Sequence, residues 1–303
     1  MFHGIINIYK EPGYTSNDVV AKLRGILKQR KIGHTGTLDP AAEGVLPVCL
    51  GKGTRLAEFL TDKQKVYEAV VLLGVETDTQ DTTGTVLSRK DTAGITEEEF
   101  RAAASSFIGD YDQVPPMYSA IKVDGKRLYE LARKGIEVER KARRVEIYEL
   151  LVKEFSLPRA TIRVRCSRGT YIRTLCYDIG EKLGCGAAME HLLREEAGTF
   201  TLETALTLSR VEAAVREGTI VEHILPVDRV FPDLRAVTAE GELPEKLIRN
   251  GNPVPADFLP GGYPGERIRV YLADGSFAGI YEYQDEPGKR RWKAEKLFLG
   301  GEE

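Results

Sequence analysis

Residues 33–53 read GHTGTLDPAAEGVLPVCLGKG, and this stretch is the most informative part of the sequence. One carboxylate, Asp39, stands in a turn rich in Gly and Pro, between a basic helical pattern and an apolar run. Loops of this kind hold reactive side chains out from a rigid scaffold. We therefore interpret Asp39 as the candidate catalytic residue of the chain.

A phosphate loop and a metal site are the two alternatives for the same stretch. The Walker pattern fails at two fixed positions, because Leu46 stands five residues before Gly51 and a glycine follows Lys52. A metal site would need a third ligand near His34 and Asp39, and no further His, Cys or carboxylate has a suitable spacing. We expect no metal and no cofactor. An Asp before Pro is also a common turn residue, so spacing alone leaves a structural role open.

Composition places the chain among folded, water-soluble proteins, with 303 residues, 42% of them hydrophobic and 29% charged. The net charge of -3 argues against an indiscriminate nucleic-acid binder. Any binding of a polyanion must therefore depend on local clusters of basic residues. Residues 141–173 hold nine basic side chains against three acidic ones, and residues 22–31 form a second basic run. Such runs most often form a solvated face.

The cysteines and the N-terminal residues predict a cytoplasmic protein. The four cysteines form no CxxC pair and no zinc-finger spacing, so we expect reduced, packed thiols. Residues 1–7 lack the pattern of a signal peptide, and no apolar run approaches the ~18 residues of a membrane span. We expect no association with a membrane.

Periodicity and turn residues predict mixed helices and strands up to residue 122. A helix begins at Ser16 or Asn17, has apolar positions as far as Leu27, and turns its basic side outward. The other expected elements are a strand at 5–9, a helix at 54–60, a strand at 66–73, a loop at 76–85, a helix at 97–108 and an extended loop at 110–122.

The following segment continues the mixture. We predict a helix over 125–134 that ends at Gly135, strands over 145–152 and 160–166, and helices over 170–183 and 187–196. Alternation along the second strand places Arg163 and Arg165 on one face and Ile162 and Val164 on the other. Because no regular alternation of strand, helix and strand appears, the sequence predicts an α+β fold around a largely antiparallel mixed sheet.

The composition changes near residues 231–232. Beyond this point, Pro and Gly separate short strand patterns such as 268–272 and 277–281. We therefore predict two domains, a large one over 1–232 and a small, mostly-β one over 233–303.

Four further motifs carry a family resemblance. They are KEPGYTSND at 10–18, GVLP at 44–47, VPPMYSAIKVDG at 114–125 and CSRGTYIRT at 166–174. Together with GHTGTLDP at 33–40, they resemble the signatures of TruB-type tRNA pseudouridine synthases, in the same order. The resemblance extends to about residue 230, and the tail is similar to the PUA-type RNA-binding domain that closes this family.

The resemblance implies roles for individual residues. Asp39 takes the role of the essential aspartate, Tyr67 that of the tyrosine stacked on the target base, and Arg173 that of the arginine paired with the aspartate. Leu192 matches an apolar residue that packs on the base. Because Leu193 is adjacent, the choice between these two leucines stays open. The positions that match substrate-binding residues are His34, Asp81, Leu192, Lys10 and Tyr171.

The implied activity is the isomerisation of the T-loop uridine (uridine-55) of tRNA to pseudouridine, without a cofactor. Breaking and re-forming the bond between base and sugar needs a carboxylate. A neighbouring guanidinium favours its ionised form and can orient it through two hydrogen bonds. The implied partner is the T arm and acceptor stem of tRNA, bound by a monomer, with no protein partner.

Two other functions stay open from the residues alone. One is a non-catalytic, tRNA-folding RNA-binding protein that extrudes a base without chemistry. The other is a nucleoside hydrolase or glycosylase, which would also place a carboxylate near the sugar. The product distinguishes them, because only a glycosylase releases free uracil.

Overall fold

The computed structural model describes residues 1–61, 63–123 and 125–299. Its chain forms two compact units. The first contains Asn7–Val48 and Ala57–Ile220, and the second contains Met1–Ile6, Cys49–Leu56 and the chain from Val221 onward. The proposed domain boundary between residues 232 and 233 stays a prediction.

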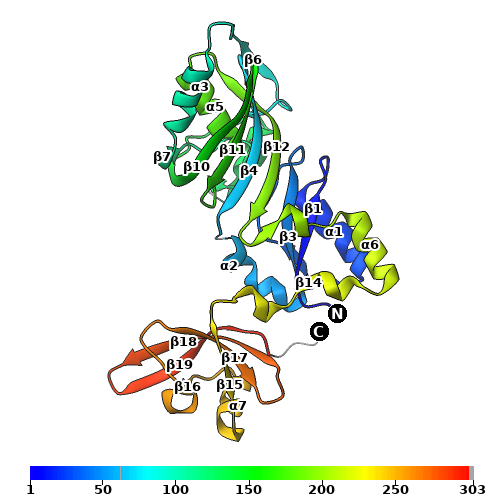
Figure 1. Ribbon diagram of the computed structural model, residues 1–303, viewed down its shortest axis with the longest axis vertical. Helices are drawn as coiled ribbons and strands as arrows, with labels where there is room; N and C mark the ends of the chain where they lie inside the picture. Colours follow the sequence, from blue (N-terminus) through cyan, green and yellow to red (C-terminus); the bar gives the residue numbers. More distant parts are fainter. Residues whose placement is uncertain (62, 124, 300–303) are drawn as a thin grey trace. The chain divides into compact units, whose positions relative to one another are not determined.

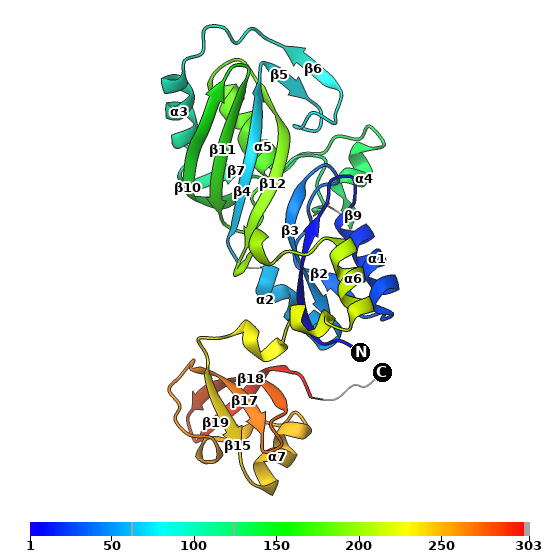
Figure 2. The same cartoon turned by 45° about the vertical axis from the view of Figure 1, so that its right-hand side comes forward.

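Most strands of the larger unit belong to one long, mixed sheet (Figures 1 and 2). Most neighbouring strands are antiparallel, whereas β12 and β3 are parallel. The predicted α+β architecture on a largely antiparallel mixed sheet is therefore confirmed. In spatial order the strands are β14 (Ile224–Leu225), β1 (Gly4–Lys10), β3 (Glu43–Leu50), β12 (Ala187–Ala197), β4 (Lys65–Leu73), β11 (Arg159–Cys166), β10 (Arg143–Ser156) and β7 (Gly109–Gln113).

Strand β12 corrects the helix that we predicted over residues 187–196. The segment AAMEHLLREE consists of good helix formers, so its local preference favours a helix. In the fold it lies between β3 and β4, and its backbone completes the hydrogen bonding of both strands. Tertiary pairing therefore overrides the local preference.

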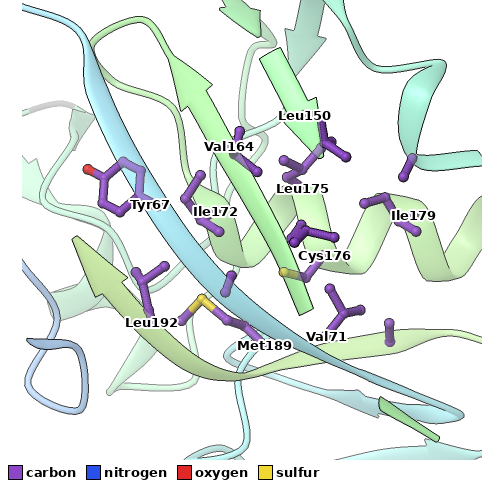
Figure 3. Close-up of a cluster of buried hydrophobic side chains, with 14 of the residues drawn as sticks. Tyr67, Val71, Leu150, Val164, Ile172, Leu175, Cys176, Ile179, Met189 and Leu192 are labelled. Carbon is purple, nitrogen blue, oxygen red and sulfur yellow. The ribbon is translucent and has the colours of Figure 1, made fainter. Parts of the chain in front are cut away.

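Two helices cover one face of the sheet and form the core with it (Figures 2 and 3). They are α3 (Glu97–Ser105) and α5 (Ile172–Lys182). Strand β11 turns Val164 into this core and Arg163 away from it, as the alternation predicts. Helix α5 lies unusually close to the start of β12, because a Cβ at Gly180 would stand 2.2 Å from the Ala187 nitrogen.

Several short elements differ from the predictions at their ends. Helix α1 (Ser16–Leu27) is capped by Thr15, whose hydroxyl accepts from the Asp18 amide, one residue earlier than expected. The predicted helix at 125–134 is a hairpin followed by a single helical turn, and the predicted helix at 54–60 begins as a 3-10 helix. These and the remaining short elements are β2 (Ile32–His34), η1 (Gly51–Leu56), α2 (Ala57–Thr61), β5 (Val75–Thr77), β6 (Val86–Arg89), β8 (Lys122–Val123), β9 (Lys126–Arg127), α4 (Leu128–Ala132), β13 (Phe200–Thr201), η2 (Leu202–Thr204), α6 (Leu208–Glu217) and η3 (Ile220–His223).

The C-terminal unit has its own curled sheet, in the order β15-β17-β18-β19-β16, as expected for a PUA-type domain. Its core surrounds Tyr281 and Trp292, which are fully buried. None of the described helices is long and apolar enough to cross a membrane. The elements are η4 (Val227–Val230), β15 (Arg235–Ala239), α7 (Glu242–Arg249), β16 (Val254–Pro255), η5 (Ala256–Phe258), β17 (Arg267–Leu272), β18 (Phe277–Glu286) and β19 (Lys289–Leu297).

The glycines of the rejected phosphate-loop pattern serve close packing within this second unit. A Cβ at Gly51 would lie 2.2 Å from His3 Nδ1, and a Cβ at Gly53 would lie 2.2 Å from the Gly4 carbonyl oxygen. Chain segments approach this closely only where no side chain intervenes. Packing alone therefore accounts for both glycines.

Candidate active site

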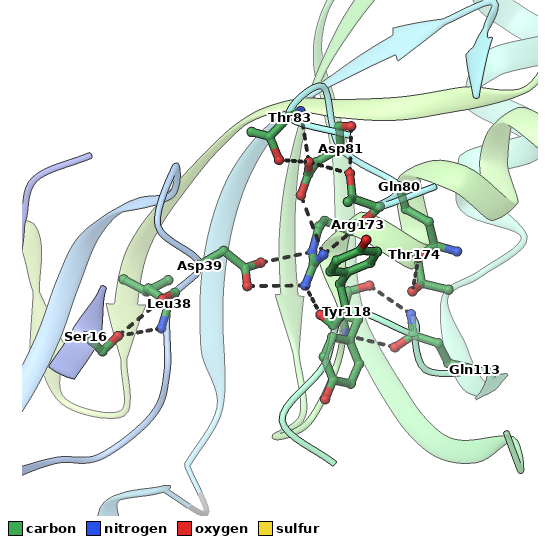
Figure 4. A network of polar contacts seen from close by, with 12 residues as sticks. Ser16, Leu38, Asp39, Gln80, Asp81, Thr83, Gln113, Tyr118, Arg173 and Thr174 are labelled. Carbon is green, nitrogen blue, oxygen red and sulfur yellow. Dashed lines mark hydrogen bonds and ion pairs between the residues drawn. The ribbon is translucent and has the colours of Figure 1, made fainter. Parts of the chain in front are cut away.

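Asp39 lies in the loop between β2 and β3 (Figure 4). The start of α1 fixes this loop, because the Ser16 hydroxyl accepts from the Leu38 amide at 2.9 Å and donates to the Leu38 carbonyl at 3.3 Å. The Ala42 amide in turn donates to the Asp39 carbonyl at 3.1 Å. The backbone on both sides of Asp39 is thus held, and the carboxylate projects toward α5.

Arg173, in the first turn of α5, meets Asp39 through a two-point contact. Its Nε lies 2.9 Å from Asp39 Oδ2, and its Nη2 lies 3.2 Å from Asp39 Oδ1. The remaining donors reach the carbonyls of Tyr118 at 2.8 Å and Thr79 at 3.1 Å, and Asp81 Oδ2 at 3.5 Å. Only 5% of the Arg173 side chain is exposed. A planar guanidinium held by three hydrogen bonds and two ion pairs has little freedom to reorient.

The charge of Asp39 is set by two opposing effects. Burial raises the pKa of Asp39, and the neighbouring Asp81 carboxylate raises it further. Arg173 lowers the pKa, as we expected, but burial has the larger effect, so the pKa lies above the ordinary Asp value. The side chain nevertheless keeps 38% of its surface exposed, which leaves room for a substrate to approach.

Asp81 is a buried partner of Arg173. Its Oδ1 accepts from the Thr83 amide at 3.0 Å and from the hydroxyls of Thr83 at 2.5 Å and Thr79 at 2.8 Å. These bonds leave Oδ2 facing Arg173. The resemblance assigns Asp81 to the extruded nucleotides, and this contact stays a prediction.

Tyr67 on β4 and Leu192 on β12 belong to one buried cluster, together with Leu38 (Figure 3). Leu193, the alternative to Leu192, is half-buried and lies outside this cluster. Burial raises the pKa of Tyr67, while the Arg194 side chain lowers it. A neutral aromatic ring beside an aliphatic side chain suits the two faces of a planar base.

Lys10, at the end of β1, is buried beneath the Asp39 loop. Its Nζ donates to the Ala42 carbonyl at 2.6 Å and the Pro40 carbonyl at 3.2 Å. Burial lowers its pKa to about 8, against the opposing effect of Asp39. The structure therefore places Lys10 as a support for the loop, and a contact with substrate stays a prediction.

His34 and Tyr171 are both half-buried. The His34 Nδ1 accepts from the Gly36 amide at 3.3 Å, and burial lowers the pKa of the imidazole. Tyr171 is the N-cap residue of α5, two positions before Arg173. Their predicted roles in substrate binding stay untested.

Sequence reasoning missed Gln113, at the end of β7. Its side chain is 1% exposed, its Nε2 donates to the Tyr171 carbonyl at 2.9 Å, and its Oε1 accepts from the Tyr171 amide at 2.8 Å (Figure 4). This pairing fixes the backbone from which Arg173 projects. The only sequence signal was a polar residue directly before the VPPMYSA motif.

Sequence reasoning also missed Arg194, which no motif singled out. In β12 it is 2% exposed. Its Nε donates to the Val45 carbonyl at 2.6 Å, and its Nη2 donates to the Gly36 carbonyl at 3.2 Å. Arg194 therefore contacts the Asp39 loop from the sheet.

The basic run at 141–173 is largely neutralised by acidic residues from other strands. Arg163, for example, lies within 4.0 Å of carboxylate oxygens of Glu149, Glu195 and Glu196. Arg144, Arg159 and Arg165 also form ion pairs. Counting charges along the sequence overestimated the positive potential of this run.

Among the residues that the structure describes, no three His, Cys, Asp or Glu side chains are grouped so that they could hold a metal ion. The four cysteines are free and buried, as expected.

Comparisons with known proteins identify one family. The model of the TruB family pseudouridylate synthase N-terminal domain matches residues 24–172, and that of the tRNA pseudouridylate synthase B C-terminal domain matches residues 173–231. The tRNA pseudouridine synthase B of Lachnoclostridium phytofermentans is 47% identical, over 98% of this chain and 100% of its own length. That of Bacillus pumilus is 42% identical, over 93% of each chain. The crystal structure of a Cbf5-Nop10-Gar1 complex contains a similar chain, with a TM-score of 0.71 and 27% identity over 98% of this chain and 85% of that one.

The family model, the relatives and the fold define the class of protein as a pseudouridine synthase, an isomerase. More narrowly, the chain belongs to the TruB family of pseudouridylate synthases. The relatives carry the same name over nearly their full length, so a purely RNA-folding role is not favoured.

Proposed function

We propose that this protein converts the T-loop uridine of tRNA, at position 55, to pseudouridine, with Asp39 as the reacting carboxylate. The observation that carries the proposal is the two-point contact between Asp39 and Arg173. It leaves more than a third of the carboxylate surface open while the guanidinium is buried. A fixed, accessible carboxylate beside a buried cation is what attack at a sugar or a pyrimidine ring requires.

The reaction breaks the bond between C1′ of ribose and N1 of uracil and joins C1′ to C5. Nothing is oxidised or reduced, and the protein must retain the detached base while it turns. Extruding the uridine costs a few kcal/mol, of which stacking on an aromatic side chain can return ~1 to 3 kcal/mol. We assign this stacking to Tyr67, with Leu192 packed against the base.

We further propose that the T arm and acceptor stem are bound through exposed basic residues and the C-terminal unit, by a monomer acting in the cytoplasm. The run at 22–31 supports this assignment better than the run at 141–173. Its members Lys22, Lys28, Arg30 and Lys31 are exposed, and none of the ion pairs found among the described residues involves them. Lys22 also acts on the Asp18 carboxylate four residues earlier on α1. Exposed positive side chains outside ion pairs are available to phosphates.

Incubation with an unmodified tRNA transcript, followed by mapping of the modified nucleotide, tests the proposal. We expect pseudouridine at the T-loop position, with no change in mass and no free uracil. A transcript with cytidine at that position is the matched control and should stay unmodified. Release of uracil would support a glycosylase, and tight binding without any conversion would support the non-catalytic alternative.

A further inference from the structure

Arg194 is a buried cation for which the structure shows no carboxylate partner. It lies in the middle of β12, paired with Tyr67 of β4 on one side and Gly44 of β3 on the other. None of the ion pairs found within residues 1–61, 63–123 and 125–299 includes its guanidinium. Burying a charge without an opposite charge costs free energy, and hydrogen bonds to the guanidinium must offset that cost.

Those hydrogen bonds join both ends of the Asp39 loop. The acceptor Gly36 precedes Asp39 by three residues, and the acceptor Val45 follows it by six. Gly44 makes this arrangement possible, because a Cβ there would lie 2.3 Å from the Arg194 carbonyl oxygen and 2.9 Å from its nitrogen. The glycine at position 44 in the signature thus lets β3 lie against Arg194.

The charge of Arg194 also reaches the groups around the site. It lowers the pKa values of Lys10 and His34, and it opposes the increase that burial causes in the pKa of the Tyr67 phenol. Lys10 connects Arg194 to the charges around Asp39, because Asp39 raises the pKa of Lys10 and Arg194 lowers it. Lys10, Arg173 and Arg194 carry positive charge against the carboxylates of Asp39 and Asp81.

We propose that Arg194 is a positioning residue that fixes both ends of the Asp39 loop and the ring of Tyr67, and that its charge stabilises the base while it is detached. When the C1′–N1 bond breaks, its electron pair stays on the base as negative charge. The bond to C5 then forms, the C5 proton leaves, and N1 takes up a proton. A fixed positive charge behind the stacked ring favours this anion over the neutral substrate. The inference rests on the proposed function.

Single-turnover rates at saturating enzyme test the proposal, with Arg194→Met, Arg194→Lys and the control Arg159→Met. Arg159 undergoes the same change but forms one exposed ion pair with Glu190. We expect Arg194→Met to lower the rate about 100-fold, as removal of a fixed electrostatic group does. Arg194→Lys should lose less, and Arg159→Met should keep its rate. The tRNA dissociation constant should stay nearly unchanged in all three variants.

A double-mutant cycle with Tyr67→Phe separates positioning from a general loss of structure. In the Tyr67→Phe background, which lacks the phenol hydroxyl, Arg194→Lys should lower the single-turnover rate by a clearly smaller factor than it does in the parent protein. Equal losses in both backgrounds, or a normal rate in Arg194→Met, would overturn the proposal. If Arg194→Met fails to fold, the rates of Arg194→Lys and of the double-mutant cycle still test the proposal.

The NMR titration of His34 measures the charge independently of activity. Arg194→Met should raise the pKa of His34, because a nearby positive charge is lost, and Arg194→Lys should leave it nearly unchanged. An unchanged pKa in Arg194→Met would overturn the electrostatic part. This readout does not depend on turnover, so it stays valid even if the transcript assay disproves the proposed reaction.

Discussion

Arg173 and Arg163 of the larger unit both bind carboxylates, and the contrast between them separates the candidate site from a solvated surface. Arg173 is 5% exposed, and its guanidinium makes three hydrogen bonds and ion pairs with Asp39 and Asp81. Arg163 on β11 is 25% exposed and approaches three glutamates, at 2.6, 3.4 and 3.8 Å. Arg163 has more carboxylate neighbours, but water screens them. Burial and fixed geometry, more than the number of ion pairs, decide which arginine can tune a reacting group.

The sharpest test of this contrast is Asp39→Asn, which removes the charge and preserves the shape. We expect the single-turnover rate to fall at least about 1,000-fold, because the variant lacks the reacting carboxylate. The tRNA dissociation constant should change little. Asp112→Asn, which alters an exposed partner of Arg144, is the matched control and should retain its rate. A normal rate in Asp39→Asn would remove Asp39 from the mechanism.

Arg173→Lys should have the next largest effect. Lysine keeps the charge but cannot form the two-point contact with Asp39 or reach the Thr79 and Tyr118 carbonyls together. We expect a loss of about 100-fold in the rate constant at saturating tRNA, measured by rapid quench. Unchanged turnover would show that the charge alone suffices.

The structure explains how far the sequence could predict this contrast. The alternation along 160–166 correctly placed Arg163 and Val164 on opposite faces, because the side-chain period of a strand is fixed by its backbone. The segment at 187–196 failed, because its helix-forming residues gave no sign of the two strands that flank it.

The sequence allowed us to predict those residues of the candidate site that lie within the motifs. The GHTGTLDP and CSRGTYIRT motifs named Asp39 and Arg173, and the structure brings them into contact, while their roles stay predictions. The other acceptors of Arg173 include the backbone carbonyls of Thr79 and Tyr118. Every residue has a carbonyl, so such contacts leave no trace in the sequence.

Gln113 tests whether Arg173 depends on the backbone beneath it. Gln113→Leu removes both hydrogen bonds to Tyr171, so we expect about a tenfold fall in rate, with a small change in tRNA affinity. Gln113→Glu keeps the acceptor for the Tyr171 amide and should lose less. If the two variants behave alike, the pairing does not position Arg173. Circular dichroism checks that both variants fold.

The pH dependence reports the environment of Asp39. The active form is the carboxylate, so the rate should rise with pH through the pKa of Asp39, which lies above the ordinary Asp value near 3.9. Asp81→Asn removes a neighbouring negative charge, which stabilises the ionised form and lowers that pKa. The acidic limb of the single-turnover profile should therefore move to lower pH. A shift to higher pH would contradict this electrostatic account.

The smallest effect is expected on the solvated face. Arg163→Gln should change the rate less than about twofold, and the free energy of unfolding by about 1 kcal/mol, a loss that added salt reduces. Urea denaturation at two salt concentrations measures it. A rate loss as large as that of Arg173→Lys would erase the distinction between the two arginines.

Gly180 links catalysis to a position that no nucleotide needs to touch. Arg173 stands seven residues earlier on the same helix, and Leu192 lies five residues beyond Ala187, against which Gly180 packs. Any larger residue at 180 must push these two elements apart, and Arg173 and Leu192 would move with them. In a saturation library selected for tRNA modification, this position should be as intolerant as the aspartate itself, although it lies about 10 Å along the helix from Arg173.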